Sequence, residues 1–138
     1  MSIGITVGAI TDEIGNGDFI HAFFSSICAL CEPNGWGSKY PLLMNELYQG
    51  SLAWNNAKQA LLELKDARLC LEKFPPAAVV WDINEPDSRP PWGDKIAGTI
   101  TNMGNYFVSS SGRDLFDLLE EALEASYTSK KDAIIEHF

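Results

Sequence analysis

The chain has 138 residues, a length that suits one domain, and 46% of them are hydrophobic, enough for a packed core. Asp and Glu number 19 against 10 Lys and Arg, which gives a formal net charge of −9. This charge argues against nucleic acid and membrane surfaces as direct partners, because phosphate groups repel it, and it favours a basic protein partner. Acidity for solubility alone explains the same charge equally well.

The charge is uneven along the chain, since no Lys or Arg occurs before Lys39. That stretch carries the acidic residues Asp12, Glu13, Asp18 and Glu32. Its start lacks the basic segment and apolar run of a secretory signal, and Phe19–Cys31 is shorter than the roughly 20 residues of a spanning helix. We therefore expect a cytoplasmic protein, and the three cysteines, an odd number, favour a reducing compartment over a disulfide framework.

Alternating apolar residues over Ile3–Ile10 predict a first strand. Thr11–Asp18 is rich in Gly, Asn and Asp, which predicts a turn with Asp18 as the N-cap of a helix. That helix is expected over about Phe19–Leu30, where apolar residues recur at helical spacing. The stretch Trp36–Gly50 fits a short helix as well as a strand.

The second half is expected to alternate helices, strands and one proline-rich loop. In chain order, the elements are a helix over Leu52–Lys73 capped by Ser51, a strand over Ala78–Ile83, a loop over Asn84–Asp94, a strand over Tyr106–Ser109 and a helix around Leu115–Leu123. The tail around Ile134 and Ile135 fits a last helical turn. These elements predict a small α/β or α+β domain over residues 1–138, with a short sheet of about three strands packed against three main helices.

Cys28 and Cys31 have the CxxC spacing, but they fall at the end of an apolar helix, whereas a redox motif uses the helix start. We interpret them as core residues, with a zinc or redox site that includes Cys70 as the alternative. The chain has no GxSxG, GxxxxGK[ST] or GxGxxG pattern. Its paired carboxylates lack a nucleophilic or basic counterpart, so we expect no enzyme, no cofactor and no metal.

Acidic residues surround a tryptophan on the loop that three prolines stiffen. This first candidate partner-binding surface consists of Asp82, Glu85, Asp87, Trp92 and Asp94. Interfaces favour an aromatic anchor beside steering charges, and a stiff loop loses little entropy on binding. The alternative for Trp92 is that it folds back onto the core. A second candidate surface consists of Asp12, Glu13 and Asp18.

Several longer segments together resemble the immunity protein 70 family. They are GITVGAITDEIGNGDF, YPLLMNELYQGSL, VVWDI, PPWG and NYFVSSSGRDLF, and the resemblance runs from about Ile3 to Ala125. This family comprises bacterial immunity proteins of polymorphic-toxin and contact-dependent growth-inhibition systems. The resemblance implies that the chain binds and neutralises a cognate toxin domain, and it supplies no catalytic residues. Because such toxins are often nucleases with basic surfaces, it also implies that the acidic chain blocks an active or substrate-binding surface.

Two functions of other classes fit the same sequence. One is a small hydrolase that uses clustered carboxylates or a metal held by Cys28, Cys31 and Cys70. The other is a structural subunit that associates with copies of itself. For the toxin-binding function, which we favour, we expect a monomer or a weak homodimer.

Overall fold

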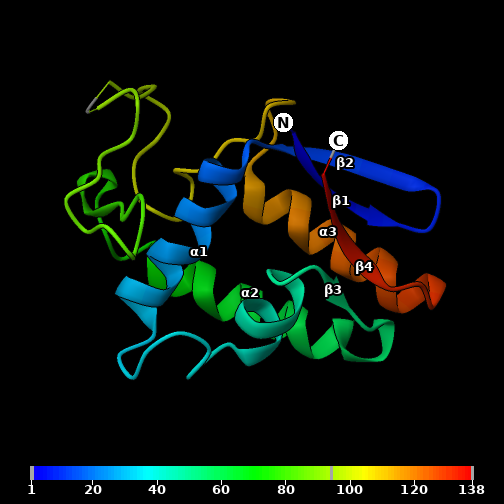
Figure 1. Ribbon diagram of the computed structural model, residues 1–138. Coiled ribbons are helices and arrows are strands. Elements are labelled where there is room, and N and C mark those ends of the chain that lie inside the picture. Colours follow the sequence, from blue (N-terminus) through cyan, green and yellow to red (C-terminus); the bar gives the residue numbers. More distant parts are fainter. Residues whose placement is uncertain (1, 94, 138) are drawn as a thin grey trace.

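Figure 1 shows a computed structural model of the chain, in which residues 2–93 and 95–137 are described. Over these residues the fold is α+β, with a four-stranded antiparallel sheet and three α-helices. The strands are β1 (Ile3–Val7), β2 (Ile10–Gly15), β3 (Ser51–Leu52) and β4 (Ala133–His137). The helices are α1 (Gly17–Cys31), α2 (Ala57–Leu71) and α3 (Leu115–Ser129). The predicted fold class is therefore confirmed.

The sheet has the order β2-β1-β4-β3, so the first and last strands of the chain lie side by side (Figure 1). β1 and β2 form a hairpin with Gly8 and Ala9 at its turn, where Gly8 has a φ of +63° that suits glycine. The turn expected over Thr11–Asp18 is therefore wrong. β2 is an edge strand with one fully buried residue, Ile14, so its polar residues hid the strand pattern.

Helix α1 begins after Asn16, whose side chain accepts the backbone N–H of Phe19 at 2.8 Å, so Asn16 is the N-cap in place of Asp18. Its apolar face places Phe23 at the centre of the core, with edge-to-face ring contacts to Phe24, Phe107 and Phe116. Helix α3 packs on the sheet, and α2 packs on both α3 and α1.

The strand expected over Ala78–Ile83 is wrong, although the segment lies against the core as its apolar residues predict. The Ser26 hydroxyl donates to the Val80 carbonyl at 3.1 Å and accepts the Val80 N–H at 3.1 Å. The Ser25 hydroxyl accepts the N–H of Ile83 at 3.2 Å. Side chains of α1 therefore supply the hydrogen bonds that a neighbouring strand would supply. The strand expected over 106–109 reduces to one bridge, between Val108 and Asp114.

Two buried carboxylates order the ambiguous stretch between α1 and α2. Glu32, only 3% exposed, accepts the backbone N–H groups of Gly37, Lys39 and Tyr40. Glu63 accepts those of Leu42 and Leu43, and a π-helical segment, Leu43–Leu47, follows. Glu32 thus belongs to the interior, so it adds nothing to the acidic surface predicted for the N-terminal part.

Two further boundaries differ from prediction because β4 pairs with β3. Ser51 and Leu52 form β3 against Ile134 and Ala133, so Ser51 is not a helix cap and α2 begins only at Ala57. The tail that was expected to be helical is β4, whose Ile135 lies opposite Ile5 of β1. A short strand such as β3 carries too few residues to show an alternating pattern.

The cysteines pair across two helices, which corrects the expectation that they form no disulfide. Cys31 of α1 is bonded to Cys70 of α2, with their Cα atoms 6.1 Å apart, while Cys28 is free and buried. Within residues 2–93 and 95–137, no group of three His, Cys, Asp or Glu side chains is placed to hold a metal ion. In the same part of the chain, no helix is long and apolar enough to cross a membrane.

Candidate partner-binding surface

The acidic loop is fastened to α1 at its first carboxylate. Oδ1 of Asp82 lies 3.0 Å from Nε2 of His21 and accepts the backbone N–H of Asn84 at 2.9 Å. The Asn84 N–H and, after it, the His21 ring hold the pKa of Asp82 below its usual value. Asp82 is therefore a fixed negative charge at the base of the loop, while Glu85 and Asp87 beyond it are exposed.

Trp92 lies half over the core and half in solvent. Its indole N–H donates to the Tyr106 hydroxyl at 2.9 Å, and its ring meets that of Trp81 edge to face with the centroids 5.2 Å apart. Even so, 38% of the residue remains exposed. Trp92 thus combines the two arrangements considered from the sequence, because the same contacts that hold it on the core also fix the orientation of its exposed part.

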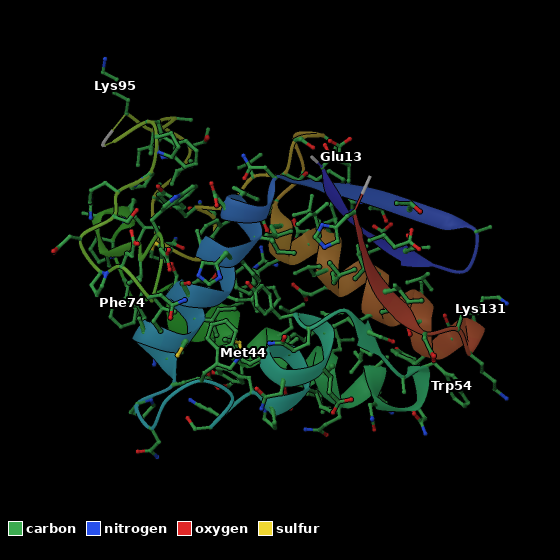
Figure 2. All side chains as sticks on the ribbon, in the orientation of Figure 1. Glu13, Met44, Trp54, Phe74, Lys95 and Lys131 are labelled. Atoms are coloured by element: carbon green, nitrogen blue, oxygen red, sulfur yellow. A yellow bond between two sulfur atoms is a disulfide. The ribbon has the colours of Figure 1, made fainter. Side chains whose placement is uncertain are left out.

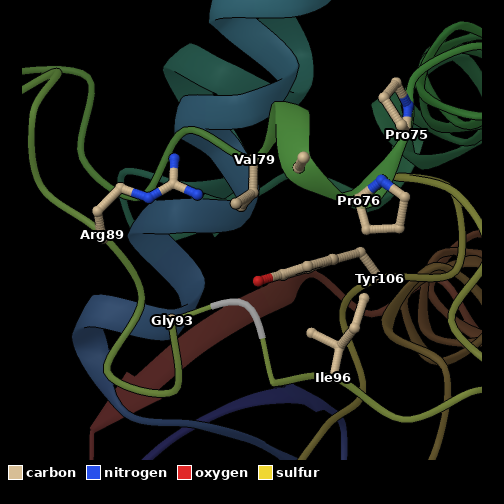
Figure 3. Close-up of a pocket in the computed structure, with 8 residues that line it drawn as sticks. Pro75, Pro76, Val79, Arg89, Gly93, Ile96 and Tyr106 are labelled. Atoms are coloured by element: carbon tan, nitrogen blue, oxygen red, sulfur yellow. The ribbon is translucent and has the colours of Figure 1, made fainter.

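The long connection between α2 and α3 packs on itself through Tyr106. A shallow pocket of about 300 Å³ lies beneath it, and Figure 3 shows the Tyr106 ring reaching into this pocket near Pro76 and Ile96. Lys95 stands at the outer tip of this connection in Figure 2, far from Trp54 and Lys131 at the other end of the molecule. The hydroxyl of the same Tyr106 side chain accepts the Trp92 indole N–H, so Tyr106 holds Trp92 in place.

The residues of the second predicted surface, Asp12, Glu13 and Asp18, do not form one surface in the structure. Asp12 approaches Arg113 with their charged atoms 3.9 Å apart, whereas Glu13 accepts the Ser2 hydroxyl on the opposite face of the sheet. Asp18 is exposed on α1, one turn before His21, and so lies on the helix face next to Asp82. A pocket of about 290 Å³ connects the start of α1 to Trp92. Asp94 lies outside the described residues.

A groove beside the loop brings together residues that no sequence motif connected. It has a volume of about 570 Å³ and is lined by His21, Cys28, Gly35, Trp36, Tyr48, Ile83 and Asn84. The Tyr48 hydroxyl lies 2.7 Å from Nδ1 of His21, so Asp82, His21 and Tyr48 form one hydrogen-bonded chain. The sequence analysis missed this groove, and the ionisable ring of His21 within the apolar repeat of α1 is the one signal that could have drawn attention to it.

The order of these three groups resembles that of a catalytic triad, with a phenol in the place of the nucleophile. Burial and then the charge of Asp82 raise the pKa of Tyr48, which keeps the phenol protonated. The same contacts hold the Tyr48 and His21 rings in fixed positions, as a preformed binding surface requires.

Comparison with protein-family models matches residues 5–135 to the family described as immunity protein 70. The chain belongs to the immunity protein 70 family. The match covers almost the whole of the described structure, so the core, the loop and the groove all lie within the family's domain. No curated protein and no solved structure matches the chain.

Membership of the immunity protein 70 family confirms the resemblance seen in the sequence and points to toxin neutralisation as the role of the chain. An immunity protein acts by binding a toxin, which agrees with a surface built from a stiff loop, an anchored tryptophan and a preformed groove.

Proposed function

We propose that the chain neutralises a cognate toxin domain, a nuclease, by covering its basic active or substrate-binding surface. The contact surface is the acidic loop formed by Asp82, Glu85, Asp87, Trp92 and Asp94, with Asp18 beside it, and Asp12 and Glu13 of the hairpin as a more distant second region. The protein acts in the cytoplasm of the producing cell as a monomer or a weak homodimer.

The observation that carries this proposal is the attachment of the loop to α1. Asp82 is held by His21 and by the Asn84 N–H, and Trp92 is held by Tyr106, so charge and aromatic anchor are both oriented before binding. Preorganisation lowers the entropy that a loop loses when it binds. A net charge of −9 adds attraction to a basic surface and speeds the encounter with it.

Charge reversal tests the loop in binding measurements with the cognate toxin domain. We expect the double variant E85K/D87K to slow association by about tenfold or more at low salt, and the loss to shrink at high salt, because long-range attraction is screened. Trp92→Ala is expected to speed dissociation instead, since an anchor acts once the complex has formed.

The matched control is E121K/E124K, which makes the same charge change on α3, outside the loop. Both side chains belong to exposed residues, and the Glu121 contact to Arg113 is a surface ion pair of little weight. Equal association rates for the two double variants would show that the loop is not the contact surface. Circular dichroism of each variant confirms that the fold is intact.

A further inference from the structure

The groove beside the acidic loop has walls that are aromatic and fixed. The Trp36 indole N–H donates to the Met44 carbonyl at 2.9 Å, which sets the orientation of that ring. The Tyr48 ring lies between its neighbours, with ring centroids 5.3 Å from Trp36 and 4.7 Å from Phe24. Because both rings are already held, a side chain that enters the groove meets a formed surface.

The groove is also negative. None of the residues lining it in the described structure is Lys or Arg. Asp82 stands at its edge, bonded to the His21 that lines it, and Glu32 lies behind Cys28. These two carboxylates raise the pKa of groove residues, Asp82 that of Tyr48 and Glu32 that of Cys28, each in addition to the larger effect of burial. Asp82 therefore places a negative charge at the edge of the groove, and no Lys or Arg among the described lining residues offsets it.

We propose that this groove receives a lysine or arginine side chain of the toxin, with its stem against Trp36 and Tyr48 and its cation next to Asp82. This inference rests on the proposed function, because the toxin is the occupant, and it adds the specific contact that the acidic loop alone does not define.

Three features favour a cation over other occupants. Aromatic faces attract cations, and tryptophan does so best. The chain already uses this contact internally, since Arg68 lies over the Phe116 ring and Lys130 over Trp54, at 5.5 and 5.9 Å from the ring centroids. An anionic occupant would be repelled by the charge of Asp82, and a purely apolar one would remove water from that carboxylate without adding a contact to it.

Asn84 offers a clean test because only its backbone N–H bonds to Asp82, so its side chain can change without releasing the loop. Asn84→Lys sets a competing cation at the groove, and Asn84→Asp adds an acid of nearly the same shape. We expect N84K to weaken toxin binding by about tenfold or more, and N84D to keep or strengthen it. Gln59→Lys makes the same charge change at an exposed position of α2, away from both the loop and the groove, and serves as the control.

A second measurement follows the Trp36 indole N–H by NMR during titration with N-acetyl-lysine methylamide and with its neutral norleucine analogue. We expect the lysine probe to shift this resonance in the wild-type protein, and both the norleucine probe and the N84K variant to show little shift. This arm needs no toxin, so it tests the chemistry of the groove directly.

The outcomes separate this inference from the proposed function. If the toxin binds and N84K loses no more affinity than Q59K, the groove is not a contact and the inference is overturned, while the loop proposal stands. If the norleucine probe shifts the resonance as much as the lysine probe, the groove does not select a cation and the inference is also overturned. Absence of any toxin binding by the wild-type protein overturns both proposals.

Discussion

Nε2 of His21 lies 3.0 Å from Oδ1 of Asp82, a contact between residues 61 positions apart in the sequence. This contact joins the start of the acidic loop to helix α1 and so fixes the position at which the loop leaves the core. The other ring nitrogen of His21 contacts the Tyr48 hydroxyl, so this one side chain connects three segments of the chain.

We expect His21→Ala and Asp82→Asn each to lower the free energy of unfolding, and the double variant to lose less than the sum of the two. The pKa of Asp82 is lowered in the folded protein, so its contribution is present above the ordinary Asp value of about 3.9 and disappears as the pH falls through the folded value. Urea unfolding between about pH 2 and pH 7 measures this, and strictly additive effects at neutral pH would show that the contact has no energetic weight.

Ser26 is completely buried and its hydroxyl makes both hydrogen bonds to Val80. Ser26→Ala removes the partner of the partly buried N–H and carbonyl of Val80, so we expect a loss of about 1–3 kcal/mol in the free energy of unfolding. Ser51→Ala, at an exposed position of β3, should change it by less than about 0.5 kcal/mol. Similar values for the two variants in chemical denaturation would contradict the bonding scheme.

Burial raises the pKa of Glu63, although the N–H groups of Leu43 and Leu42 act in the other direction. A raised folded pKa means that Glu63 favours folding most below its unfolded value of about 4.3 and loses that contribution as the pH rises through the folded value. Glu63→Gln keeps an acceptor without the charge. We therefore expect its free energy of unfolding to increase relative to wild type between about pH 4 and pH 8.

Denaturant titrations across that pH range provide the measurement. Glu63→Ala is the companion variant, because it removes the acceptor and should be destabilising at every pH. A Gln variant that becomes less stable than wild type as the pH rises would show that the charged carboxylate is the favoured form in the folded protein.

Arg68 of α2 holds the start of α3 through three carboxylates. Its guanidinium lies 2.7 Å from Asp117 and from Glu120, and 3.5 Å from Asp114, the N-cap of α3. Arg68→Met leaves these acids without their cation, and we expect the free energy of unfolding to fall by about 1–2 kcal/mol. This is less than for a fully buried ion pair, because the Arg68 side chain is partly exposed. Burial raises the pKa of Asp114, so this carboxylate loses its charge early as the pH falls, and the deficit should shrink in acid.

Arg113→Met is the matched control, because Arg113 contacts the exposed Glu121. We expect this variant to lower the free energy of unfolding by less than about 0.5 kcal/mol. Thermal unfolding of both variants at pH 7 and pH 3 makes the comparison. A loss in R68M no greater than that in R113M would mean that the α2–α3 contact depends on packing alone.

The helices could be predicted because each has a long apolar face, as Phe23 and Ile27 show in α1. The strands could be predicted only in part. β2 buries little beyond Ile14, while the apolar segment before Asp82 bonds to serines of α1 instead of to a strand. Propensity describes the segment itself, and its partner decides which element it becomes.

The acidic loop could be found as a cluster along the chain, but the groove could not. His21, Tyr48 and Asn84 come from three separate segments, and only tertiary packing places them around one space. Likewise Glu32 has the composition of a surface acid, and only the turn that folds over it shows that it is buried. The family match covers the chain without marking either feature.

The most direct test of the central claim is a titration of the purified chain with the cognate toxin domain, with toxin activity measured on the same mixtures. We expect a one-to-one complex with a dissociation constant of about 10 nM or tighter and loss of toxin activity at the equivalence point. No heat of binding at micromolar concentrations, together with full toxin activity in the presence of excess chain, would contradict it.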